Sequence, residues 1–138
     1  MIRKEMEMRE IKFRYWDKEK CTMEHDFDLT SDGSAFTCSC GYDCDRVHEE
    51  KAIIMQFTGL NDKNGVEIYE GDKLTFTMGH SGRQHDGDVL WSDCTAGFMI
   101  EYAFIHEKRA IRSYAAFGLG IHEIEVIGNI HENPDLIG

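Results

Sequence analysis

The chain has few of the features that mark membrane, secreted or disordered proteins. It has one proline in 138 residues and no run of about 18 apolar residues that could cross a bilayer. The charged start, "MIRKEMEMRE", lacks the apolar core of a secretion signal. Hydrophobic residues make up 41%, too many for a disordered chain. We therefore expect a folded cytoplasmic protein that does not contact a membrane.

Positive charge is also scarce. The sequence has 15 basic residues against 26 acidic ones, a net charge of −11. This excess disfavours nonspecific binding to nucleic-acid phosphates, although a local basic patch remains compatible with it. An acidic surface keeps a protein soluble, and it also suits docking on a basic protein partner.

Recognisable catalytic motifs are missing. The sequence contains no phosphate-binding loop and no dinucleotide fingerprint, and none of its seven histidines belongs to a nucleophile motif. His122, Glu123 and Glu125 resemble an acid/base group. Strand alternation, however, puts both glutamates on the outward face. We expect no enzyme activity.

Alternation of apolar and polar residues predicts an all-β protein. It is clear over residues 10–17 and again over 73–78, and the whole chain reads as roughly seven to nine short strands with little helix. Short strands at this spacing are typical of a barrel or sandwich. One short helical turn is predicted at the C-terminus, where Asn133 can cap it and Pro134 suits its first position.

Two glycine-centred turns interrupt the stretch "FTGLNDKNGVEIYEGDKLTF", Phe57 to Phe76. The first is predicted at Asn64-Gly65 and the second at Gly71-Asp72. Both glycines are expected to adopt the positive φ that tight turns need. We interpret these residues as structural rather than catalytic.

The strongest chemical candidate is the cluster "CSCGYDCDRVH". Cys38, Cys40 and Cys44 form a C-x-C-x3-C pattern, and His48 follows. Thiolate and imidazole are preferred zinc ligands, but a C-x-C pair is tight for one tetrahedral centre. The alternative is a set of reduced thiols in a variable loop. We expect no resident cofactor, and zinc is the metal that the sequence leaves open.

Two further segments could bind a ligand. In "KFRYW", Lys12, Arg14 and Trp16 would share one strand face, which would suit a nucleic-acid base or an acidic peptide. The alternative is an ordinary surface strand. The stretch "MGHSGRQHDGD" places His80 and His85 near glycines, and we interpret it as a solvated hairpin tip.

Four blocks of the sequence together resemble the YopX family, small proteins of phages and prophages, mostly in Gram-positive bacteria. The blocks are "MREIKFRYWD", "IMQFTGLNDKNGVEIYEGDKL", "GDVLWSDCTAGFMIEY" and "EVIGNIHENPDL". The resemblance implies a mainly β fold whose C-terminal part is similar to an SH3-like barrel. It implies no established activity and no catalytic residues. The cysteine cluster departs from the family pattern, so the resemblance does not support zinc.

These observations give one domain organisation and a ranked set of functions. Residues 1–7 are expected to be an extension of a single compact domain, 8–138, with N-terminal strands in 8–50 and the barrel-like part in 51–138. We expect an accessory protein of the bacterial host cell that binds a protein partner. A nucleic-acid-binding small barrel and a metal-dependent hydrolase using the Cys/His cluster are the alternatives. Self-association is also compatible with the sequence.

Overall fold

The computed structural model describes residues 10–38, 44–118 and 120–134, and within these ranges it is all β. The strands are β1 (Phe13–Asp17), β2 (Thr22–Glu24), β3 (Asp28–Leu29), β4 (Ala35–Cys38), β5 (Cys44–Val47), β6 (Ala52–Asn61), β7 (Glu67–Tyr69), β8 (Asp72–Met78), β9 (Gln84–Ser92), β10 (Gly97–His106), β11 (Arg109–Ala116) and β12 (Ile121–Asn129). The predicted all-β class is confirmed. The predicted C-terminal helical turn extends past the described residues and stays a prediction.

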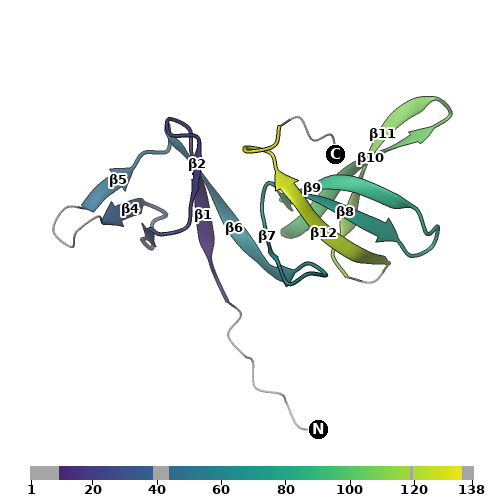
Figure 1. The fold of residues 1–138 in the computed structure, drawn as a ribbon, viewed down its shortest axis with the longest axis horizontal. Helices are drawn as coiled ribbons and strands as arrows, with labels where there is room; N and C mark the ends of the chain where they lie inside the picture. The colour runs from purple at the N-terminus through teal and green to yellow at the C-terminus, as the bar shows by residue number, and fades with distance from the viewer. Residues whose placement is uncertain (1–9, 39–43, 119, 135–138) are drawn as a thin grey trace, which may run out of the picture.

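The N-terminal half forms two antiparallel sheets. The larger has the order β2-β1-β6-β7, and the smaller has the order β3-β4-β5. Figure 1 shows the smaller sheet at one end of the molecule, with β6 and β7 leading toward the other end. The segment between β2 and β6, which shows little alternation in the sequence, therefore contains the antiparallel pair β4–β5.

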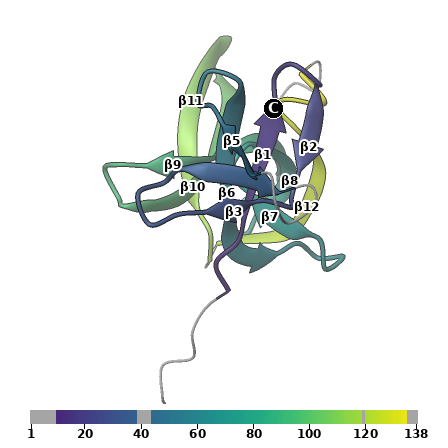
Figure 2. The same ribbon diagram turned by 90° about the vertical axis from the view of Figure 1, so that its left-hand side faces the viewer.

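The C-terminal half is a five-stranded antiparallel sheet with the order β11-β10-β9-β8-β12. The sheet curls into a half-barrel, and its two edge strands, β11 and β12, lie on opposite sides in Figure 2. Its concave face holds the main core, made of Ile68, Leu74, Phe76, Val89, Ile100 and Ala115. The similarity of this half to an SH3-like barrel stays a prediction.

The alternation of residues in β8 correctly predicts which side chains are in the core, but it wrongly predicts that the side chains on the opposite face are exposed. Leu74 and Phe76 are fully buried, as their spacing predicts. The same alternation predicts that Lys73 points outward into solvent, yet Lys73 is buried and its Nζ lies 3.2 Å from Asp88 Oδ1. The neighbouring strand β9 supplies the carboxylate that makes this burial tolerable.

Both predicted glycine turns are confirmed. Gly65 has a φ of 82° and Gly71 a φ of 83°. Before the first turn, the buried carboxylate of Asp62 accepts hydrogen bonds from the backbone N–H groups of Asn64 (2.8 Å) and Val66 (2.9 Å). The side chain of Asp62 thus closes this turn, since each bond satisfies a backbone donor.

The turn between β7 and β8 joins the two halves of the molecule. Gly71 donates its N–H to Val89 O (2.9 Å) in the C-terminal sheet, and the N–H of Ile130 donates to Gly71 O (2.9 Å). The preceding residue, Glu70, donates its N–H to Gln56 O (3.0 Å) in the N-terminal sheet. Consecutive residues are therefore hydrogen-bonded to different sheets.

Candidate functional site

The structure corrects the predicted "KFRYW" platform. Arg14 is 7% exposed, and its Nη2 lies 2.6 Å from Oδ1 of Asp72, which is 2% exposed. The guanidinium carbon also lies 4.5 Å from the centre of the Tyr69 ring. Arg14 is therefore an interior residue and cannot present its charge to a ligand.

The other two members of the expected platform are also engaged within the protein. Lys12 forms ion pairs with Glu67 and with Glu10 (3.0 Å), and its hydrogen bonds to these glutamates raise its pKa. Trp16 stacks on His131, with ring centres 5.5 Å apart and planes 15° apart. Lys12 and Trp16 are half-buried and already paired within the protein, so with Arg14 buried this strand face does not form the expected platform.

The Arg14–Asp72 pair is the most buried ion pair among the described residues. Burial raises the pKa of Asp72, while the charge of Arg14 and the hydrogen bond from the Tyr69 N–H (2.8 Å) act to lower it. Ions are costly to bury, and their mutual attraction offsets that cost only when the geometry is good. The pair orients β1 against the start of β8 and has no open position for a ligand.

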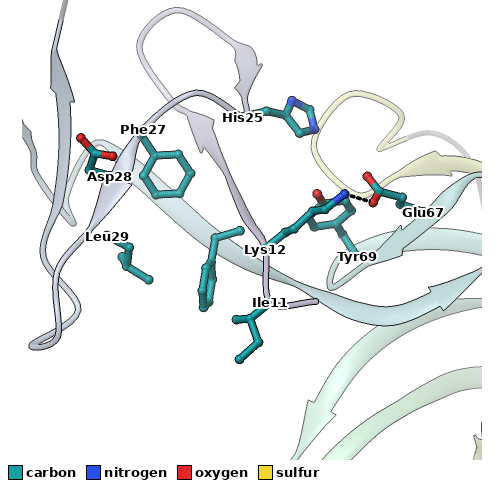
Figure 3. Close-up of a pocket in the computed structure, with 9 residues that line it drawn as sticks. Ile11, Lys12, His25, Phe27, Asp28, Leu29, Glu67 and Tyr69 are labelled. Carbon is teal, nitrogen blue, oxygen red and sulfur yellow. Dashed lines mark hydrogen bonds and ion pairs between the residues drawn. The ribbon is translucent and has the colours of Figure 1, made fainter. Parts of the chain in front are cut away.

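A groove lies beside the start of β1, and apolar side chains make up much of its lining (Figure 3). Ile11 and Phe13 line it from β1 and the residues just before it. Phe27 and Leu29 line it from β3 and the residue before that strand (Figure 3). Its volume is about 560 Å³. Ile11 is 58% exposed, although large apolar side chains stabilise a fold only when they are buried.

Charged groups border this groove. The Lys12–Glu67 ion pair lies along one side and Asp28 lies on the other (Figure 3). Lys12 also lies over the Phe57 ring at 5.4 Å, which places its stem along the sheet. The groove thus combines an apolar lining with charged edges, an arrangement common in protein-binding surfaces.

A second cleft continues from the groove and is strongly acidic. The two share Phe27 and Asp28. The ring of Phe27 is held edge-on against Tyr15, with centres 5.0 Å apart. Four carboxylates line the second cleft against one lysine: Glu24, Asp26, Asp28 and Asp45, with Lys20. Sequence analysis missed this site because its two sides are separated along the chain.

The cysteine cluster is only partly described. Cys38 and Cys44 are direct partners across the β4–β5 pair, and His48 follows β5 as an exposed residue. Cys40 lies outside the described residues. Within the described ranges, no group of three or more Cys, His, Asp or Glu side chains is arranged to hold a metal. The expectation of no cofactor, with zinc as the alternative, is therefore untested at this cluster.

Comparison with known proteins decides the family. The model of the family described as YopX protein matches residues 12–138. The chain belongs to the YopX family. A search among curated proteins gives no match.

Among the described residues, no helix is long and apolar enough to cross a membrane.

Two solved structures are similar to this chain. Protein EF1440 from Enterococcus faecalis is 28% identical, with a TM-score of 0.54, over 93% of this chain and 98% of that one. Protein yopX from Bacillus subtilis is 20% identical, with a TM-score of 0.60, over 95% of this chain and 100% of that one. The second likeness shows the fold alone.

Proposed function

We propose that this YopX protein is a non-enzymatic interaction module, encoded by a phage or prophage and active in the bacterial cytoplasm. Its ligand is a segment of a protein partner, which binds in the groove beside β1. The observation that carries the proposal is the continuity of the apolar groove with the acidic cleft through Phe27 and Asp28.

The chemistry of the site defines the segment it would accept. Ile11, Phe13 and Leu29 would contact apolar side chains of the partner. The carboxylates of the neighbouring cleft would attract lysine or arginine next to them. Among the described residues, Asp26 and Asp28 form no ion pair within the protein. The expected ligand is therefore an apolar segment flanked by basic residues.

Selection from a library of random peptides tests this specificity directly. We expect enrichment of peptides that combine apolar residues with lysine or arginine. The double variant Asp26→Lys/Asp28→Lys should bind an enriched peptide about tenfold more weakly, because the two reversed charges together cost about 1.4 kcal/mol at an exposed site. Ile11→Asp should also weaken binding, because it places a charge in the apolar groove.

Leu60→Asp provides the matched control. Leu60 is 45% exposed and belongs to β6, outside the groove. Its substitution should leave the affinity for the enriched peptide within about twofold of that of the parent protein. The proposal is wrong if the library gives no enriched motif, if the motif is acidic, or if Leu60→Asp weakens binding as much as Ile11→Asp does.

A further inference from the structure

A second hollow lies on the C-terminal half, away from β1. It is formed by the β8–β9 hairpin and by β10, and its volume is about 390 Å³. The lining includes Met78, His80, Arg83, His85, Tyr102 and Phe104. Nothing in the proposed protein-binding site involves these residues, so the hollow requires its own explanation.

The aromatic rings of this hollow form a row. Tyr102 and Phe104 are two residues apart on β10 and therefore share one face, with ring centres 6.2 Å apart. His85 lies beside Tyr102 at 5.0 Å. Beneath them the fully buried Phe76 meets Tyr102 edge-on at 5.4 Å. The core thus holds Tyr102 in place, and both it and Phe104 are only partly buried.

The charged side chain that lines this hollow is Arg83, a cation, although the chain has a net charge of −11. His80 and His85 also line the hollow, and no acidic residue does. The register of the β10–β11 hairpin continues the face past Phe104. There His106 stands opposite Arg109. His106 Nε2 lies 3.9 Å from Glu107 Oε1 at the hairpin tip.

The carboxylates of the same strands belong to the opposite face. Asp88 is the register partner of both Lys73 and Glu101, and it forms an ion pair with Lys73. Glu101 forms an ion pair with Arg112 (3.2 Å). Strand alternation therefore places Asp88 and Glu101 on the face opposite the hollow, where cations pair with them, and leaves the hollow lined by aromatic rings, histidines and Arg83.

We propose that this hollow binds single-stranded nucleic acid. Bases would stack on Tyr102 and Phe104, because an exposed aromatic ring accepts the flat face of any base. Arg83 and Arg109 would contact phosphates on either side. An acidic peptide could also form ion pairs with the arginines, but its side chains would gain less from contact with the two aromatic rings. Nucleic acid is therefore the better match. Salt at ordinary ionic strength screens carboxylates that lie more than about 10 Å from the hollow, so the net negative charge of the chain weakens this attraction little.

The test measures binding of a fluorescent oligothymidylate of about 12 nucleotides to the full-length protein at about 50 mM salt. Arg83→Glu should reduce affinity about tenfold or more and lower the slope of affinity against salt. Phe104→Ser should also weaken binding, through lost stacking, but leave the salt slope unchanged. Circular dichroism of each variant checks that it is folded.

Arg112→Glu is the matched control, because it reverses an arginine on the opposite face of the same sheet. This variant is expected to bind the oligonucleotide with an affinity within about twofold of that of the parent protein. The inference is overturned if the oligonucleotide does not bind, or if the two arginine variants behave alike. It is also overturned if a polyglutamate peptide displaces the oligonucleotide at equal concentration, which would assign the hollow to acidic peptides.

Discussion

The Arg14 side chain on β1 reaches Asp72 at the start of β8, and Nη2 and Oδ1 lie 2.6 Å apart. Both side chains are buried, and the arginine stacks over Tyr69. This contact joins the N-terminal and C-terminal sheets through charge, in addition to the apolar contact of Ile68 with the main core. It explains why the arginine that resembled part of a ligand platform in the sequence is buried.

Removing one partner of this pair should destabilise the fold strongly. We expect Arg14→Met or Asp72→Asn to reduce the free energy of unfolding by about 3–5 kcal/mol, because the remaining polar group is left buried without its partner. Urea denaturation measures the change. The double variant Arg14→Met/Asp72→Asn should lose less than the sum of the single losses.

An exposed ion pair is the control for that experiment. Lys51 Nζ lies 3.3 Å from Glu19 Oε1, and both side chains are more than half exposed. Lys51→Met should change stability by less than about 1 kcal/mol. Equal losses for Lys51→Met and Arg14→Met would show that the buried pair has no special role.

Asp62 should contribute to acid sensitivity. Burial acts to raise the pKa of Asp62, but hydrogen bonds from the N–H groups of Val126 (2.9 Å), Val66 and Asn64 outweigh it, and the pKa is lowered. The folded state therefore favours the ionised form. Its stabilisation is present above the unfolded pKa of about 3.9 and is lost as pH falls through the lower folded value.

Asp62→Asn should consequently destabilise by about 1.5–3 kcal/mol at neutral pH and lose less stability on acidification than the parent protein. Thermal melts between about pH 7 and pH 2 compare the two. The exposed Asp86→Asn is the control. A parallel pH profile for Asp62→Asn and the parent protein would contradict the assignment.

Gly71 should tolerate substitution less well than Gly65. Both have positive φ, so an alanine at either costs about 1–2 kcal/mol in strain. A Cβ at Gly71 would also lie 3.2 Å from Met55 Sδ, whereas one at Gly65 would meet nothing within 4 Å. Gly71→Ala is therefore expected to unfold at lower urea concentration than Gly65→Ala. The reverse order would refute the packing argument.

Protonation of His131 should report on the Trp16 contact. Burial, with the charges of Arg14 and Lys18, lowers the pKa of His131 below its usual 6.5. The folded state favours the neutral ring, so stability declines as pH falls from about 6.5 through the lower folded value. In a Trp91→Phe variant, Trp16 fluorescence should titrate with a midpoint below 6.5, because Trp16 stacks on this ring.

His131→Gln should remove this fluorescence transition. Persistence of the transition in that variant would mean that another group causes it. A midpoint above 6.5 in the parent background would contradict the direction of the pKa shift.

Local pattern predicted much of the fold. Alternation places Leu74 and Phe76 in the core, and the glycines at 65 and 71 mark real turns, because side-chain period and positive φ are properties of short segments. The same reasoning failed for Lys73 and Arg14. Alternation states which face a side chain is on, but not whether another strand covers that face.

The sequence by itself determined an all-β YopX chain, its glycine turns and its acidic character, since each depends on composition or on neighbours within a few residues. Only the tertiary structure decided that Arg14 is buried, because its partner Asp72 is 58 residues away. Tertiary packing also brought Ile11 and Phe27 into the lining of one groove and brought Arg83 and Tyr102 into the lining of another. Both proposed binding surfaces depend on contacts between segments that fold together, which no single stretch of sequence contains.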